Sequence, residues 1–283
     1  MKKIVTRTIT VVTVVPALVA IIVLAPWYCH LAINLLAVGA SVIGAYEASA
    51  LFSAQWRSPT PVFIPVLGAA FPAATYLQIC GVLPAGWELP LLVAIASLLL
   101  VREVFVAREE EFLRILPRLG ASMTILIYPG LFVSFFVRFS LLPESSLSMI
   151  VFLLIVFAND VFAYLAGSLW GSRSRRILPV SPNKSLVGFI GGIAGSAAIA
   201  AAAWFVVPQV FFHNLALLIA VAISVAIATI IGDLVESAMK RSAQVKDSGQ
   251  IIPGRGGILD SIDSVIFASP LCFYLLARGA GIW

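Results

Sequence analysis

Three aspartates near the end of the chain have the side-chain type and the spacing to bind a metal ion. Asp260 and Asp263 are three positions apart where the last apolar stretch begins, so a helix would place both on one face. Asp233 ends the preceding apolar stretch and is expected at the same depth. Carboxylate oxygens are the preferred ligands of a hard cation such as Mg²⁺, and we predict that these three residues bind one. The alternative is that they are helix-end charges in water, since Asp260 and Asp263 also suit a helix N-terminus.

A fourth aspartate, Asp160, lies within an apolar stretch, directly after Asn159. An ionisable side chain inside a membrane span is costly, and it is by default a sign of function. We therefore predict Asp160 as a further metal ligand and Asn159 as a substrate-binding residue. A structural hydrogen-bonding role inside a helix bundle is the alternative.

The segment 237–263 combines charge with glycine, whereas residues 185–232 before it contain no Asp, Glu, Lys or Arg. Cations, carboxylates and flexible backbone together suit a phosphate chain with a divalent metal. The polar and glycine residues in question are Ser237, Lys240, Arg241, Lys246, Asp247, Arg255, Gly256 and Gly257.

Lys184 is a second candidate for phosphate binding. Ser181, Ser185 and Gly188 surround it in the sequence, and all three are compatible with a bound phosphate. The chain has no nucleotide P-loop pattern, so this would be a different kind of phosphate cradle.

The composition is that of a membrane protein. Of the 283 residues, 61% are hydrophobic and 11% are charged, and the mean hydropathy is +1.07. A soluble domain has about 25% charged residues. We predict an all-α polytopic bundle with about nine transmembrane helices, each of a length suited to crossing the bilayer. The predicted spans are 8–29, 31–53, 61–82, 88–101, 120–141, 147–170, 186–207, 211–232 and 264–282.

The distribution of basic residues predicts the orientation of this bundle. With a cytoplasmic N-terminus, the inner segments would hold 16 of the 18 Lys and Arg residues, and only Arg138 and Arg278 would fall outside them. Basic residues concentrate in cytoplasmic loops, so the charged segment 237–263 is expected to face the cytoplasm. The protein would be an integral, multi-pass component of a bacterial-type inner or plasma membrane.

The segment 237–263, SAMKRSAQVKDSGQIIPGRGGILDSID, resembles the signature of the phosphatidate cytidylyltransferases, also called CDP-diacylglycerol synthases. The pattern of that family runs S-x-x-K-R-x4-K-D, then P-x-H-G-G, then D-R-x-D, and every spacing is kept. The N-D-x-x-A-Y-x-x-G element from Asn159 and the S-P-x-K-S element from Ser181 are also similar to the family. Three positions depart from it: Arg255 stands for a histidine, Ser261 for an arginine, and Val187 for a glutamate.

The resemblance implies a transferase of phospholipid biosynthesis that moves CMP from CTP to phosphatidic acid and releases pyrophosphate. It implies Mg²⁺, with a second cation left open, and catalytic roles for Asp260, Asp233, Lys240 and Asp247. The residues expected to bind substrate are Lys184, Ser181, Ser237, Arg241, Lys246, Arg255, Gly256, Gly257 and Asn159. The lipid phosphate, with a second pKa of about 6, would itself be the nucleophile, so no protein base is required. The expected partners are CTP, phosphatidic acid and the bilayer, with no nucleic acid; a homodimer is left open.

The chain is expected to divide into two regions. Residues 146–283, which carry the resemblance, would form the catalytic region with its cytoplasmic loops. Residues 1–145 would be a scaffold of membrane spans, with an amphipathic helix near 102–119 lying at the membrane interface.

Two other functions fit parts of the pattern. One is a CTP-dependent kinase or cytidylyltransferase that acts on another lipid, such as a polyprenol or an ether lipid. The other is a cation transporter in which Asp160, Asp233 and Asp260 line an ion path. The carboxylates are expected at one membrane face and the loop beside them is basic, and both features argue against transport.

Overall fold

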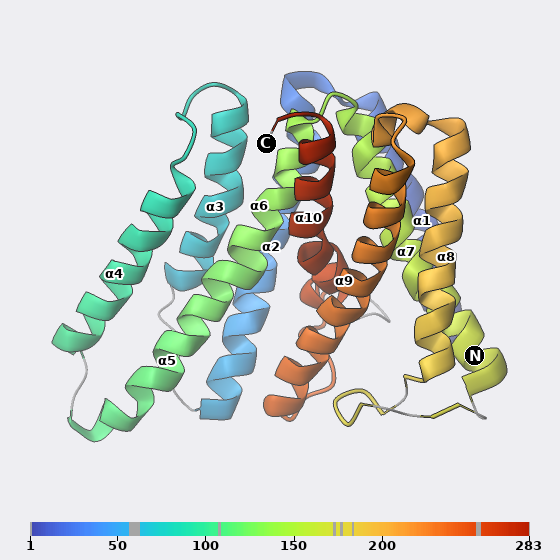
Figure 1. The fold of residues 1–283 in the computed structure, drawn as a ribbon. Coiled ribbons are helices and arrows are strands. Elements are labelled where there is room, and N and C mark those ends of the chain that lie inside the picture. The colour runs from blue at the N-terminus through green and yellow to red at the C-terminus, as the bar shows by residue number, and fades with distance from the viewer. Residues whose placement is uncertain are drawn as a thin grey trace.

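The computed structural model describes residues 2–56, 63–106, 109–171, 174–175, 178–182, 184–252 and 256–282, without the side chains of 2–12, 54–56, 106 and 111. These residues form a bundle of helices joined by loops and contain no named β-strand (Figure 1). The first residues of α1 (Lys2–Leu24) and the last of α10 (Leu259–Gly279) lie at opposite ends of the bundle. The predicted all-α class is confirmed.

Between these two helices the chain runs through a succession of long helices and short helical segments. In order they are α2 (Trp27–Trp56), α3 (Phe63–Ile79), α4 (Glu88–Val106), the 3-10 turn η1 (Glu109–Glu111), α5 (Phe112–Ile125), the π-helical segment η2 (Leu126–Leu131), α6 (Phe132–Val137), the 3-10 turn η3 (Arg138–Leu141), α7 (Ser145–Trp170), α8 (Leu186–Val206), the 3-10 turn η5 (Pro208–Phe211) and α9 (Leu215–Ser242).

Six helical runs in the described residues are long and apolar enough to cross a membrane. They are Trp27–Ser53, Phe112–Leu141, Ser145–Trp170, Leu186–Val206, Leu215–Ser242 and Leu259–Gly279. Helices α1, α3 and α4 occupy the three other predicted positions, but their described residues do not meet the same criteria of length and composition. The structure therefore supports six membrane-spanning helices, and the number nine stays a prediction.

The predicted amphipathic helix near 102–119 is not one continuous helix in the described residues, and its place at the membrane interface stays a prediction. Helix α4 continues to Val106, the turn η1 follows, and α5 begins at Phe112 and runs on through η2, α6 and η3 to Leu141. Figure 1 shows α4 and α5 side by side as the two arms of a hairpin. At the ends of these two arms Val104, Phe105, Leu113 and Leu116 are exposed, whereas Glu103 and Arg118 are buried and form an ion pair between the arms.

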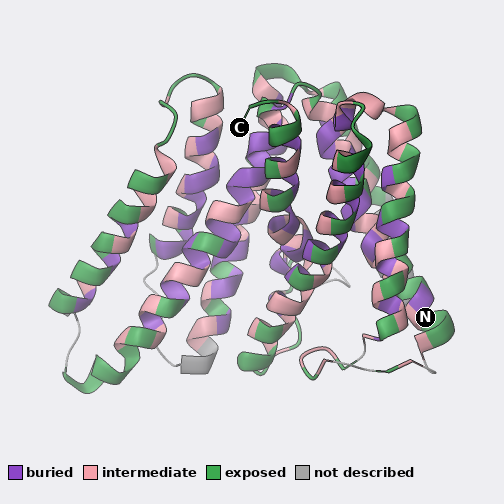
Figure 2. Ribbon diagram, in the orientation of Figure 1, coloured by how far each residue is buried: buried purple, intermediate pink, exposed green. Residues whose placement is uncertain are grey.

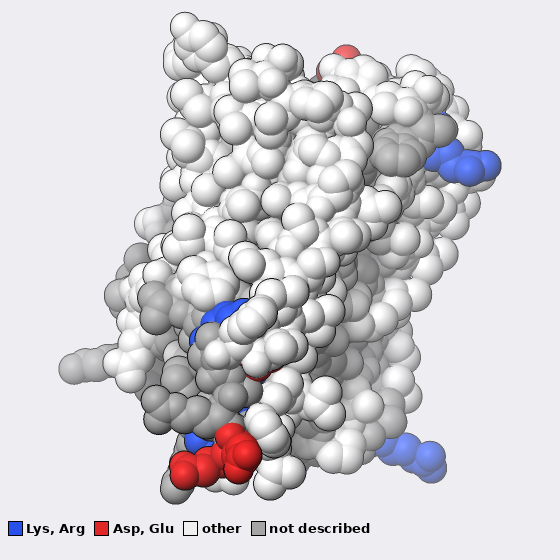
Figure 3. Space-filling view, turned by 90° about the vertical axis from the view of Figure 1, so that its left-hand side faces the viewer, with Lys and Arg blue, Asp and Glu red and all other residues white. Residues whose placement is uncertain are grey.

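The surface of the bundle is apolar over most of its length. Figure 2 shows buried residues on the inward sides of the helices and exposed residues on their outward sides. On the face of Figure 3, the Lys, Arg, Asp and Glu side chains lie mostly toward the two ends of the bundle, with a wide uncharged region between them. This distribution is expected of helices surrounded by lipid.

Small residues let the helices of the second half pack closely. Gly191, Gly192 and Gly195 of α8 face α7, and a Cβ atom at any of them would overlap Ala166, Asn159 or Phe162. Small residues at helix contacts in membranes permit this close approach of two backbones. Gly232 plays the same part between α9 and α10, since its Cβ would lie 2.7 Å from Phe267 Cβ and 2.8 Å from the Asp263 carbonyl oxygen.

The last two helices extend further than predicted, and their bounds determine where the charged residues lie. Helix α9 continues to Ser242, beyond its predicted end at 232, and α10 begins at Leu259, before its predicted start at 264. Figure 1 shows α10 beginning deeper in the bundle than the lower end of α9. As a result, Asp233 and Lys240 lie on a continuous helix, and Asp260 and Asp263 lie in the first turns of the next one.

Candidate functional site

The loop between α9 and α10 folds around the carboxylate of Asp260. Asp260 Oδ2 accepts hydrogen bonds from the Ser248 backbone N–H (2.8 Å), the Ser248 hydroxyl (2.9 Å) and the Gly257 N–H (2.8 Å). The other carboxylate oxygen, Oδ1, accepts from Lys240 Nζ at 2.5 Å. A charge that enters an apolar bundle must be paired and hydrogen-bonded, and Asp260 meets both conditions through the loop.

Gly256 makes this turn possible. Its φ is +107°, a backbone conformation that side chains rarely adopt, and a Cβ atom there would lie 2.5 Å from Asp260 Oδ2. Ile252 and Gly256 exchange backbone hydrogen bonds of 2.8 and 3.0 Å, which closes the loop between Ser248 and Gly257, the two residues of the loop that bind Asp260. The predicted glycines Gly256 and Gly257 thus shape the loop backbone around this carboxylate.

A group of three carboxylates lies beside this loop and could hold a metal ion. One ligand oxygen from each of Asp233, Glu236 and Asp263 lies within 4.8 Å of the other two. Glu236 and Asp263 are buried, whereas Asp233 is half-buried. The close contact of α9 with α10 at Gly232 brings these side chains together.

Two lysines accompany the carboxylate group. Lys240 Nζ contacts Glu236 as well as Asp260, and Lys184 Nζ forms an ion pair with Asp233. Lys184 belongs to the connection between α7 and α8, so three separate segments meet here. Burial lowers the pKa of Lys184, while the negative charges of Asp263 and Asp160 oppose that shift. The interaction also indicates that Asp160 of α7 lies near this group.

The metal ligands predicted from the sequence are therefore only partly grouped by the structure. Asp233 and Asp263 are together, and Asp160 is near them, but Asp260 is bound by the loop and Lys240. Glu236 was not among the predicted residues. The signal for it was present, because Glu236 follows Asp233 by three positions and shares its helical face.

Several predicted site residues are exposed to solvent. The substrate-binding candidates Arg241 and Lys246 and the catalytic candidate Asp247 are exposed around the lower end of α9 and the following loop, and Asp247 lies beside Gly256 next to Asp260. Ser181 accepts a backbone hydrogen bond from Lys184 (3.1 Å) and so turns the chain before that lysine. Ser237 is half-buried on α9, and Arg255 lies outside the described residues.

Asn159 has a structural role in this arrangement. Its side-chain amide is buried and donates to Ser196 Oγ (3.1 Å) and to the Ala226 carbonyl oxygen (3.3 Å). These bonds join α7 to α8 and α9. Asn159 thus helps to hold together the helices that carry Asp160 and Asp233, and its role in binding substrate stays a prediction.

The sequence prediction also missed Glu47, in the first half of the chain. Its carboxylate accepts hydrogen bonds from the backbone N–H groups of Ile258 (3.0 Å) and Leu259 (2.8 Å), where α10 begins. Glu47 is a buried charge within an apolar span, and that alone is a sign of function. The scaffold region thus contributes at least one side chain to the site.

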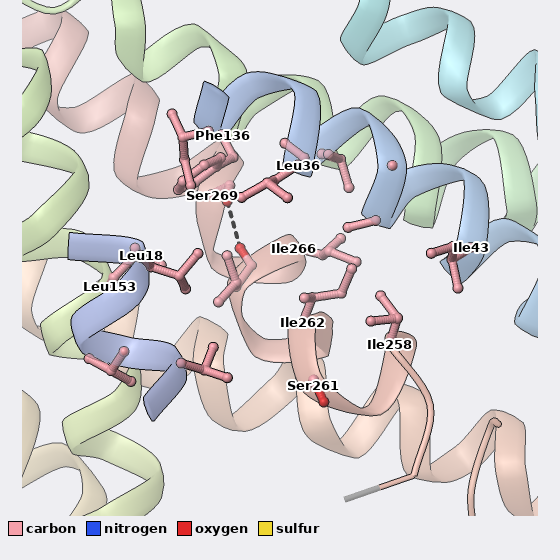
Figure 4. Close-up of a pocket in the computed structure, with 18 of the residues that line it drawn as sticks. Leu18, Leu36, Ile43, Phe136, Leu153, Ile258, Ser261, Ile262, Ile266 and Ser269 are labelled. Atoms are coloured by element: carbon pink, nitrogen blue, oxygen red, sulfur yellow. Dashed lines mark hydrogen bonds between the residues drawn. The ribbon is translucent and has the colours of Figure 1, made fainter. Parts of the chain in front are cut away.

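An apolar pocket of about 410 Å³ adjoins the loop. Helices α1, α2, α7 and α10 supply most of its walls, and Figure 4 shows Leu18, Leu36 and Ile262 lining it. Ile258 and Ser261, on either side of Asp260 in the sequence, also line it. The polar site and an apolar space are therefore neighbours at the start of α10.

Comparison with known proteins decides the family. The model of the cytidylyltransferase family matches residues 5–278, which is nearly the whole chain. The chain belongs to the cytidylyltransferase family. The resemblance seen in the loop motif is thereby confirmed, and it extends to the apolar first half.

Individual members of the family are similar over part of their length. A phosphatidate cytidylyltransferase of Bacillus subtilis is 38% identical over 153 residues, covering 53% of this chain and 55% of that protein. A protein of the same name from Synechocystis is 39% identical over 135 residues, covering 47% of this chain and 44% of that protein. Another from Staphylococcus haemolyticus is 45% identical over 126 residues, covering 44% of this chain and 47% of that protein. The chain spans about half the length of the curated relatives it matches.

Replacing Gly256 with alanine should destabilise this cytidylyltransferase-family protein. A residue other than glycine in a left-handed conformation costs about 1–2 kcal/mol. Contact of the new Cβ with Asp260 should add an overpacking penalty of about 1–3 kcal/mol. The measurement is the free energy of unfolding of the purified protein in detergent.

Gly86→Ala is the matched control for this substitution. Gly86 also has a positive φ, +82°, but nothing lies within 4 Å of the position of its Cβ. The control should therefore show the conformational penalty alone. Equal losses of stability in the two variants would contradict a tight fit between the loop and Asp260.

Proposed function

We propose that this protein transfers CMP from CTP to phosphatidic acid, which gives CDP-diacylglycerol and pyrophosphate. The observation that carries the proposal is the meeting of a carboxylate group, Lys184 and Lys240 beside the loop that holds the family motif. The names of the similar proteins support this choice of nucleotide and lipid. The same group of residues lies toward one end of the bundle, which is not the arrangement of an ion path.

The reaction requires positioning and charge neutralisation. An oxygen of the lipid phosphate attacks the α-phosphorus of CTP and forms a new phosphoanhydride bond. The bond from the α-phosphorus to the oxygen shared with the β-phosphate breaks, and pyrophosphate leaves with the electron pair. Since the lipid phosphate is largely dianionic at neutral pH, no proton needs to be removed by the protein.

The basic residues around the site suit the triphosphate. Lys240 is held by Asp260 and Glu236, so its ammonium group is fixed before a ligand arrives. Arg241 and Lys246 are exposed at the mouth of the loop, where they would meet the phosphates of CTP from water. Fixed cations stabilise the charge that develops on a leaving pyrophosphate and lose little energy in reorganisation.

The carboxylate group fits Mg²⁺. Its members are oxygen donors of a hard-cation type, and of the two oxygens of buried Glu236, Oε2 is paired with Lys240 while Oε1 has no hydrogen-bond partner among the described residues. Asp233, Glu236 and Asp263 would hold the ion, with Asp160 nearby. When bound, Mg²⁺ would neutralise negative charge on the triphosphate. We assign Asp260 a different part, which is to position Lys240 and the loop.

The apolar pocket is suited to an acyl chain of the lipid. It begins at Ile258 and Ser261, next to the residues that hold Asp260, and runs between α2 and α10. A phosphatidic acid with its phosphate at the carboxylate group could therefore place a hydrocarbon chain there. The end of the bundle that carries the loop would face the cytoplasm, as the concentration of basic residues indicates.

The purified protein should consume CTP only when phosphatidic acid and Mg²⁺ are both present. The products, CDP-diacylglycerol and pyrophosphate, can be followed with labelled CTP. Asp263→Asn should lower kcat by about 10–100-fold or more. A loss of about 10–100-fold is seen even for residues that only support a metal ligand.

The controls separate this function from its alternatives. Glu109→Gln removes an exposed carboxylate outside the site and should keep the wild-type rate. Turnover with dolichol instead of phosphatidic acid would favour a different lipid substrate. Undiminished turnover in excess EDTA would refute the role of a divalent cation.

A bulky side chain in the apolar pocket should weaken the binding of phosphatidic acid with long acyl chains. Gly39 lines the pocket and has nothing within 4 Å of its Cβ position, so Gly39→Phe would occupy the space without an initial clash. We expect the KM for dioleoyl phosphatidic acid to rise on the order of tenfold, the scale of effects in apolar substrate pockets. The KM for dihexanoyl phosphatidic acid and that for CTP should stay at the wild-type values.

Gly120→Phe on α5 is the control for this variant. Gly120 is exposed, lies outside the pocket and also has nothing within 4 Å of its Cβ position. An equal rise in both KM values for lipid in Gly39→Phe, or the same rise in Gly120→Phe, would rule out an acyl chain in this pocket.

The orientation can be tested by labelling single cysteines from either side of the membrane. Lys246→Cys in a variant without the native cysteines places an exposed thiol in the loop after α9. A variant that keeps Cys80 alone has an exposed thiol directly after α3, at the opposite end of the bundle from that loop (Figure 1). A membrane-impermeant maleimide added to intact cells should label only the Cys80 variant. Labelling of the Lys246→Cys variant alone would show that the protein has the opposite orientation in the membrane.

A further inference from the structure

The side chain of Glu47 connects the two halves of the chain. Besides the N–H groups of Ile258 and Leu259, its carboxylate lies 3.2 Å from the Ser248 hydroxyl. All three contacts are to residues more than 200 positions away in the sequence, and Glu47 is only 7% exposed. A buried carboxylate that accepts several hydrogen bonds restrains each of the groups that donate to it.

The loop is shaped to receive this carboxylate. A Cβ atom at Gly249 or at Gly257 would overlap the carboxylate oxygens of Glu47. Two glycines of the loop therefore lie directly against one side chain of α2. The N–H groups of Ile258 and Leu259 are at the start of α10, where the helix dipole also favours a negative charge.

A short chain of contacts leads from Glu47 to the proposed site. The Ser248 hydroxyl is within hydrogen-bond distance of both Glu47 Oε2 (3.2 Å) and Asp260 Oδ2 (2.9 Å). Asp260 in turn holds Lys240, which contacts Glu236. Displacement of Glu47 would release the Ser248 hydroxyl in the loop and the N–H groups of Ile258 and Leu259 at the start of α10.

We propose that Glu47 is a positioning residue for the transfer reaction. It holds Ser248 of the loop and the start of α10 at Ile258 and Leu259, and thereby fixes Asp260, Lys240 and Asp263 relative to one another. The inference rests on the proposed function, but Glu47 itself would touch neither CTP nor the lipid phosphate. It assigns a part in the site to the first half of the chain, which carries none of the motif.

Glu47→Gln tests the inference with little change in shape. The amide keeps one oxygen as an acceptor, but its NH₂ group would face a backbone N–H that needs an acceptor. One donor at the start of α10 would then be left without a partner. A misplacement of about 1 Å can lower a rate about 100-fold, and we expect a loss of kcat on that order. The KM for CTP should change much less, since Arg241 and Lys246 are left in place.

Amide hydrogen exchange gives a second measurement that does not depend on activity. Peptides that cover Ile258 and Leu259 should exchange faster in Glu47→Gln than in the wild-type protein. Glu103→Gln is the matched control, because Glu103 is also a buried carboxylate of the first half but accepts from Arg118 (2.9 and 3.0 Å) on α5. It should lose stability without faster exchange at the start of α10 and without a fall in kcat per folded molecule.

Gly249→Ala is the second variant, for the case that Glu47→Gln does not fold. Gly249 has no positive φ, so alanine is allowed there by the backbone, but the new Cβ would push the Glu47 carboxylate away. Gly120→Ala, with nothing near its Cβ position, is its control. Faster exchange at the start of α10 together with a loss of kcat in either folded variant supports the inference.

A folded variant with the wild-type kcat, or with the wild-type rate of amide hydrogen exchange at the start of α10, would contradict the proposed role of Glu47. Failure of the wild-type protein to make CDP-diacylglycerol would instead contradict the proposed function. In that case the exchange measurement still decides whether Glu47 orders the loop.

Discussion

The constraint on which this structure depends is the burial of carboxylates in an apolar helix bundle. Asp260 and Glu47 each enter the bundle as an acid that water cannot fully reach, and an unpaired buried charge is strongly unfavourable. The loop between α9 and α10 supplies the donors for both: backbone N–H groups, the Ser248 hydroxyl and, for Asp260, Lys240. The course of this loop and the place where α10 begins follow from satisfying these two acids.

The small residues at helix contacts serve the same site from further away. Gly232 lets α9 approach α10 so that Asp233 and Glu236 come near Asp263. The glycines of α8 let it approach α7, and Asn159 then joins α7 to α8 and α9. Close backbone contact among four helices thus allows short carboxylate side chains to converge, as a site for a cation and a phosphate chain requires.

Much of the chemistry was predictable from local sequence. The isolation of charges in 237–263 from the apolar residues around them located the loop, and the motif spacing indicated the family, which the match over 5–278 confirms. Helical spacing also placed Asp260 near Asp263, but it could not tell that their carboxylates have different partners. Asp260 is bound by the loop backbone, and those hydrogen bonds depend on the φ of Gly256 and the fold of the residues before it.

The sequence by itself determined the all-α class, the apolar segments, the basic loops and the residues that a single motif brings together. These properties depend on composition and on spacing within one segment. Only the tertiary structure decided that Glu236 joins Asp233 and Asp263, that Lys184 pairs with Asp233, and that Glu47 binds the start of α10. The physical reason is that such contacts depend on which helices are neighbours and at what depth they begin. Helix packing sets both, and no local pattern in the chain records them.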